Sequence, residues 1–128
     1  MKSLATLLFT LLIGCTNTSN NFPPATSPID AGRNYIEACL QGDFEKAKAY
    51  AAGTSAMQSY TTANEKTYRA FDKEGRSSNR QASIIILDIT DQDSLHSLIH
   101  YRNSLDNKPH QMVVEKIKGN WVVASVTP

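Results

Sequence analysis

The hydrophobic pattern of this 128-residue chain changes its period once, near Gln81. Before that point, apolar residues recur three or four positions apart, which is the spacing of an amphipathic helix. After it, apolar and polar residues alternate along short segments separated by turn residues, which is typical of β-strands. A helical half followed by a strand half predicts an α+β domain whose helices pack on an antiparallel sheet.

Three helices are predicted in the first half, and residues with cap chemistry bound them. Ser27 and Pro28 favour a helix start, while Gly42 favours a helix end. Asp43 is a second N-cap candidate. The predicted helices therefore cover 28–41, 44–52 and 55–74, with 75–80 as a polar loop.

Four strands are predicted in the second half, at 83–90, 95–103, 110–117 and 121–126. The short connections between them favour an antiparallel meander. We take Asp106 with Asn107, and Gly119 with Asn120, as the centres of the last two turns. These centres fix which side chains share a face of the sheet.

One predicted sheet face is nearly all apolar and should meet the helices. Its members are Ile85, Leu87, Ile89, Leu95, Ile99, Tyr101, Met112, Val114, Trp121 and Val123. The opposite face is mixed and contains Ile84, Ile86, Asp88, His96, Leu98, His100, Arg102, Val113, Glu115, Ile117, Val122 and Val126. Two interpretations of this outer face stay open: an interface for a second copy or a protein partner, or a partly exposed surface.

The first 15 residues have the features of a secretory leader. Lys2 precedes an apolar run at 4–13, which is well short of the ~20 residues that span a bilayer. Residues 12–15, Leu-Ile-Gly-Cys, resemble the lipobox of bacterial lipoprotein signal peptides. The resemblance implies removal of residues 1–14 and attachment of lipid to Cys15. The alternative is an ordinary secretory signal with a chance cysteine.

Residues 15–27 are predicted to be the lipidated cysteine and a flexible tether, and 28–128 a single domain. The tether is polar and contains proline, with Phe22 as its one large apolar residue. Thr16 stands where an Asp would resemble an inner-membrane retention signal. We therefore expect a lipid-anchored envelope protein on the periplasmic face of the outer membrane.

Charge and cysteine content exclude several classes of protein. Lys and Arg number 13 against 12 Asp and Glu, so the basic surplus of a nucleic-acid-binding protein is absent. If Cys15 carries lipid, Cys39 has no intramolecular partner. We expect Cys39 to be a buried, inert thiol on the inner face of the first helix.

The chain resembles the nuclear-transport-factor-2-like superfamily, and within it small bacterial lipoproteins of unknown function. The resemblance lies in the helix junction at 42–47, Gly-Asp-Phe-Glu-Lys-Ala, and the closing hairpin at 115–123, Glu-Lys-Ile-Lys-Gly-Asn-Trp-Val-Val. It implies a cone-shaped domain in which helices and a curved sheet enclose a pocket. Members include isomerases, dehydratases and binding proteins, and many dimerise through the sheet.

A pocket of this kind would be lined by aromatic residues from both halves of the chain. The candidates are Tyr35, Tyr60, Tyr68, Tyr101, Met112 and Trp121. Acid–base catalysis needs a carboxylate or histidine in the pocket, and on the inner face only Asp91, His110 and Lys116 lie near its ends. We therefore predict no catalytic residues and no cofactor. We also predict no metal site, because His96 and His100 would lie ~13 Å apart on a strand, too far for one ion.

The sequence therefore predicts a non-catalytic envelope lipoprotein whose tethered domain binds a small apolar ligand or a protein. Nucleic acid is not an expected partner. The alternatives are a structural accessory of an envelope assembly complex, which would use the outer sheet face, and a pocket enzyme of isomerase or dehydratase type.

Overall fold

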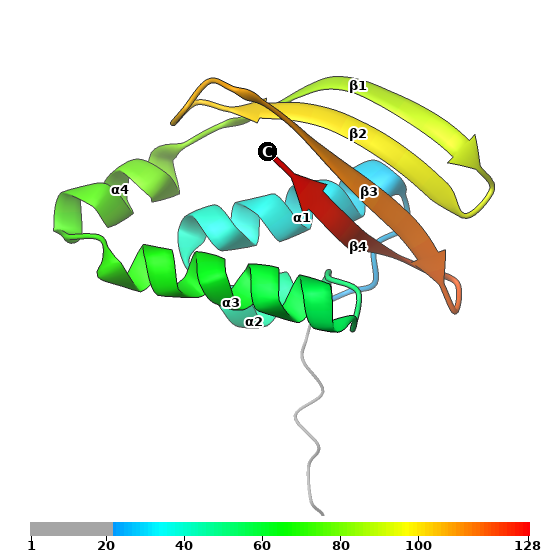
Figure 1. Ribbon diagram of the computed structural model, residues 1–128, viewed down its shortest axis with the longest axis horizontal. Coiled ribbons are helices and arrows are strands. Elements are labelled where there is room, and N and C mark those ends of the chain that lie inside the picture. The colour runs from blue at the N-terminus through cyan, green and yellow to red at the C-terminus, as the bar shows by residue number, and fades with distance from the viewer. Residues whose placement is uncertain (1–21) are drawn as a thin grey trace, which may run out of the picture.

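The computed structural model describes residues 22–128 and confirms the predicted α+β architecture (Figure 1). Four helices precede four strands. They are α1 (Pro28–Gln41), α2 (Phe44–Ala49), α3 (Ser55–Ala70), α4 (Lys73–Gln81), β1 (Ile84–Asp93), β2 (His96–Asn103), β3 (Pro109–Ile117) and β4 (Asn120–Thr127). The strands form one antiparallel sheet in the order β1-β2-β3-β4. The expected leader and lipidated Cys15 lie outside the described residues.

Helix α1 lies under the curved sheet and contacts every other helix and strand of the described chain (Figure 1). The core forms where its inner face meets the middle strands. The largest fully buried apolar side chains are Tyr35, Met57, Ile99, Met112, Val114 and Val123. Gly32 allows this close approach, because a Cβ there would lie 2.8 Å from the Met112 sulfur.

Within residues 22–128 the structure has four helices where three were predicted. The predicted third helix, 55–74, ends at Ala70, and a fourth helix begins at Lys73. Phe71 leaves the helical conformation, and the carboxylate of Asp72 accepts a hydrogen bond from the Gly75 amide at 2.7 Å. Asp72 is therefore an N-cap that starts α4. Gly75, predicted to end a helix, lies in the first turn of α4, and the predicted loop at 75–80 is helical.

Helix α2 ends at Ala49, earlier than the predicted limit of 52, because residues 50–52 form backbone hydrogen bonds with the sheet. The Val123 amide donates to the Tyr50 carbonyl, and the Ala52 amide donates to the Val123 carbonyl, both at 2.8 Å. This parallel bridge between Ala51 and Val123 joins the helical half directly to β4.

The two last turns are each centred one residue earlier than predicted. Ile117 pairs with Asn120, so Lys118 and Gly119 form the turn, both with positive φ. Arg102 pairs with Pro109, which centres the preceding loop on Leu105 and Asp106. When the centre of a turn shifts by one residue, each residue pairs with a partner two positions away from the predicted one. Because side chains alternate between faces with a period of two, the residues of β2 and β3 keep their predicted faces.

The predicted faces of β1 were wrong at its first half. Ile84 pairs with Asn103 and Ile86 with Tyr101, so both point toward the helices, whereas Ile85 is 40% exposed on the outer face. A register shift between Ile86 and Asp88 makes Leu87 an extra residue and places Ile89 opposite Ile99, on the inner face where Ile89 was predicted. Ile89 is nevertheless 40% exposed, so the helices do not cover it. Such a bulge reverses the alternation, and nothing in the local pattern marks it.

A second register shift, between Val113 and Val114, changes β4. Val126 pairs with Met112 and therefore belongs to the inner face, not to the outer face where it was predicted. The outer face is mixed as expected. Its histidines pair with acids: His96 Nδ1 lies 2.8 Å from Asp93, and His100 Nδ1 lies 3.7 Å from Asp88.

Part of the predicted tether belongs to the domain. Ala25 is buried and forms a β-bridge with Trp121. The Tyr50 hydroxyl donates to the Pro23 carbonyl at 2.7 Å, and the Thr26 amide donates to the Asp30 carboxylate. The predicted flexible segment therefore cannot extend to Ser27, because 22–26 already contacts α1, α2 and β4.

The end of α1 generates a testable prediction. Gly42 has φ 77°, and a Cβ there would overlap the Tyr68 ring. Gly119 has a similar φ of 82° but open space around it. We expect Gly42→Ala to lower the free energy of unfolding by about 2–3 kcal/mol and Gly119→Ala by about 1 kcal/mol in urea denaturation. Equal losses would mean that the Tyr68 contact contributes nothing.

Candidate functional site

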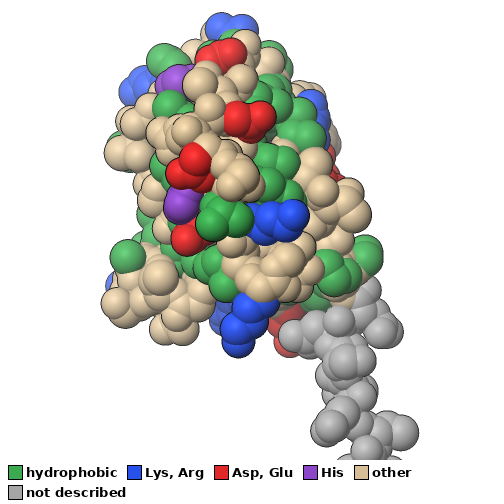
Figure 2. All heavy atoms as spheres, turned by 90° about the vertical axis from the view of Figure 1, so that its right-hand side faces the viewer, with side chains coloured by type: hydrophobic (Ala, Val, Ile, Leu, Met, Phe, Trp, Pro, Cys, Tyr) green, Lys and Arg blue, Asp and Glu red, His purple; other side chains and the backbone are tan. Residues whose placement is uncertain are grey.

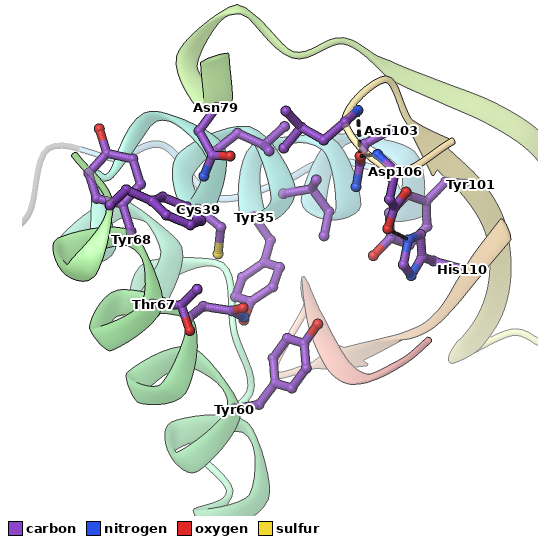
Figure 3. Close-up of a pocket in the computed structure, with 15 residues that line it drawn as sticks. Tyr35, Cys39, Tyr60, Thr67, Tyr68, Asn79, Tyr101, Asn103, Asp106 and His110 are labelled. Atoms are coloured by element: carbon purple, nitrogen blue, oxygen red, sulfur yellow. Dashed lines mark hydrogen bonds and ion pairs between the residues drawn. The ribbon is translucent and has the colours of Figure 1, made fainter. Parts of the chain in front are cut away.

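A cavity of about 360 Å³ lies at one end of the domain, between α1, α3, α4 and the hairpin that joins β2 to β3 (Figure 3). Its wall is formed by Tyr35, Ile36, Cys39, Leu40, Tyr60, Asn64, Thr67, Tyr68, Phe71, Asn79, Tyr101, Asn103, Leu105, Asp106 and His110. This volume is in the range of small-molecule sites. Both halves of the chain are needed to build it.

Four of the six residues predicted to line a pocket lie in the wall of this cavity. They are Tyr35, Tyr60, Tyr68 and Tyr101. Met112 does not reach it, because its side chain is buried in the core beneath Gly32. Trp121 lies at the other end of the sheet, against Ala25. Met112 and Trp121 are therefore not part of this cavity, because sharing a sheet face does not place residues at the same end of a strand.

The deepest polar contact beside the cavity joins α1 to α3. The hydroxyls of Tyr35 and Thr61 lie 2.9 Å apart, and both residues are almost fully buried. Burial also raises the pKa of Tyr35, Tyr60 and Tyr101 above that of a free tyrosine. These tyrosines are therefore neutral hydrogen-bonding groups at physiological pH.

An acid–histidine pair lies at the hairpin side of the cavity (Figure 3). His110 Nε2 is 2.9 Å from Asp106 Oδ2, and the His110 ring stacks on Tyr101 with centroids 5.4 Å apart. The Lys108 amide, together with His110, lowers the pKa of Asp106. An ionised Asp106 carboxylate can only accept hydrogen bonds, so the Nε2–H of His110 is the donor in this contact. The other ring nitrogen, Nδ1, takes no part in it.

Helix α4 holds the opposite side of the cavity in place. Arg80 Nη1 donates to the Tyr68 hydroxyl at 3.0 Å, and that hydroxyl donates to the Gln41 carbonyl at 3.4 Å. Tyr68 also packs edge-on against Phe44 and Phe71. The ring is thus fixed between α1, α2 and α4.

The pocket predicted from the sequence lacked the polar residues of this wall. Asn64 lies on the same helical face as Tyr60 and Tyr68, so its spacing could have included it. Asn79 was missed because 75–80 was taken as a loop. Asp106 was assigned to a turn centre, and its approach to His110 depends on the hairpin register.

No group of three or more His, Cys, Asp or Glu side chains that could hold a metal ion occurs within residues 22–128. In the register of the sheet, Asp88 lies opposite His100 because of the β1 bulge. His96 lies between Asp93 and Glu115, and its hydrogen bond with Asp93 raises its pKa.

None of the helices found in residues 22–128 has the length and hydropathy needed to cross a bilayer.

Comparisons with known proteins show the fold and nothing finer. No protein-family model and no curated protein sequence matches the chain. A solved NTF-2-like protein of unknown function from Shewanella oneidensis is similar, with a TM-score of 0.59 and 16% identity over 77% of this chain and 92% of that one. A domain of unknown function with a cystatin-like fold from Nostoc punctiforme gives a TM-score of 0.54 and 13% identity over 75% and 70% of the two chains. The chain therefore has an NTF2-like fold.

Cys39 provides a test of the cavity floor. Burial raises the pKa of its thiol from 9.0 to about 12, so at pH 8 its thiolate fraction is about a thousandfold below that of an unperturbed cysteine. We expect iodoacetamide to modify Cys39 about a thousandfold more slowly than the same cysteine in urea-unfolded protein, measured on the Cys39 peptide by mass spectrometry. Similar rates in the two states would show an ionisable, open thiol.

Proposed function

We propose that this protein is a lipid-anchored, non-catalytic module of the bacterial envelope that binds a small ligand in the cavity between the helices and the β2–β3 hairpin. The observation that carries the binding proposal is the cavity itself, which is large enough for a small molecule and is lined by residues from both halves of the chain. An NTF2-like fold is compatible with a binding module. Fold alone does not assign a ligand.

The lining indicates the chemistry of the ligand. Ile36, Leu40, Phe71 and Leu105 provide apolar surface, while tyrosine hydroxyls and three asparagine amides provide donors and acceptors. The acid in the wall, Asp106, is already paired with His110, and Arg80 is paired with Tyr68. An uncharged molecule with an apolar body and a hydrogen-bonding edge fits this lining better than an ion does.

A thermal-shift screen tests the binding proposal. A compound present at 100 times its Kd should stabilise the protein by about 2.7 kcal/mol and raise Tm. Asn64→Phe fills the cavity and should abolish that shift while leaving the apo protein folded. Thr62→Phe is the matched control, because Thr62 lies on α3 in a separate hollow and should keep the shift. Loss of the shift in both variants would contradict binding in the cavity.

A second candidate function, acid–base catalysis in the cavity, is favoured by the Asp106–His110 pair. Because the Nε2–H of His110 donates a hydrogen bond to Asp106, Nδ1 is the ring nitrogen with which a neutral His110 would accept a proton from a bound molecule. The two functions separate once a ligand is known. Catalysis would be established if the wild-type protein converts the compound over time and the His110→Asn variant still binds the compound but no longer converts it. An unchanged compound would favour binding alone.

The anchor rests on the sequence of residues 1–15, which lie outside the described structure. The short apolar leader and the cysteine after Leu-Ile-Gly support acylation at Cys15. We expect mass spectrometry to find the wild-type protein cleaved before Cys15 and acylated, and Cys15→Ser uncleaved and without lipid. A soluble, unlipidated wild-type protein as the main species would contradict the anchor.

A further inference from the structure

The described chain begins against a hollow at the end of the domain opposite the cavity. This N-terminal hollow, about 150 Å³, is lined by Phe22, Pro23, Pro24, Ala25, Ala49, Tyr50, Asn120, Trp121 and Val122. In Figure 2, hydrophobic side chains lie beside the point where the described residues begin. The hollow thus joins the start of the described chain to the β3–β4 turn.

The residues around the N-terminal hollow combine aromatic rings with lysines. Phe22 and Trp121 are partly exposed, Pro23 and Pro24 are exposed, and Lys116 Nζ lies 5.9 Å from the centre of the Trp121 ring. Lys118 is exposed in the adjoining turn. Tryptophan and lysine are residues that favour the boundary between lipid and water, because each combines an apolar body with a polar group.

The length of chain before Phe22 restricts where this end can lie. Only residues 16–21 separate Cys15 from Phe22. Even fully extended, that stretch reaches about 25 Å. The predicted tether of 15–27 would have allowed the domain to stand further away, but 22–26 is held against the domain by Tyr50, Trp121 and Asp30.

We propose, on the premise that Cys15 is lipidated, that the N-terminal hollow rests on the lipid surface together with Lys116 and Lys118, with Trp121 at the level of the headgroups. Strand β3 separates this end from the β2–β3 hairpin, and its nine residues span about 27 Å. The cavity therefore opens away from the bilayer, and its ligand arrives from the aqueous compartment.

Trp121 is the sole tryptophan of the chain, so its fluorescence reports on this end alone. Lipidated protein purified from membranes is reconstituted into phosphatidylethanolamine–phosphatidylglycerol vesicles that carry a lipid quencher at the headgroup level. We expect a blue shift and strong quenching of Trp121, and weaker quenching in the Lys118→Glu variant. The matched control carries Trp121→Phe with Lys108→Trp, which moves the reporter to the opposite hairpin and should remain unquenched.

The outcomes distinguish docking, meaning contact of the N-terminal hollow with the lipid surface, from the lipid anchor at Cys15. Wild-type protein that floats with the vesicles but shows no more quenching than the Lys108→Trp control overturns the docking and leaves the anchor intact. A hollow covered by residues 16–21 or by another protein would give this result. Wild-type protein that fails to float, like Cys15→Ser, overturns the anchor and with it the docking.

Discussion

The close seating of α1 under the sheet is the constraint on which the rest of the domain depends. Gly32 has no side chain, and so the helix reaches Met112 and Ile99 at a distance that a Cβ would not allow. Every other described helix and strand contacts α1. Its first turns meet the segment that follows Phe22, while its last turns, with Tyr35 and Cys39, form the floor of the cavity.

The two ends of α1 therefore serve two different parts of the proposed function. At the C-terminal end, α3 and α4 close around the helix and Arg80 holds Tyr68 beside the opening. At the N-terminal end, Ala25 joins β4 and Tyr50 holds Pro23. Since β3 runs between these ends, anchoring at one leaves the other accessible to solvent.

Local rules of the sequence predicted that the helices precede the strands, and they predicted most of the element limits and part of the candidate site. Cap chemistry placed α1 correctly, because Ser27 and Gly42 act through their immediate neighbours. The same rules failed where two of them competed: Gly75 suggested a helix end, although Asp72 three residues earlier caps a new helix. Four tyrosines were assigned to a pocket and line the cavity, but His110 and Asp106 were not assigned to it.

The change from helices to strands, the antiparallel meander and the aromatic residues of the inner face can all be predicted from the sequence. These properties follow from residue period and turn chemistry, which act over a few residues. The bulge at Leu87, the inward side chain of Val126 and the hydrogen bond between Asp106 and His110 become visible only in the folded chain. A bulge reverses the faces of a strand without altering its composition, and a cavity exists only where segments distant in sequence pack incompletely. Those outcomes depend on long-range packing.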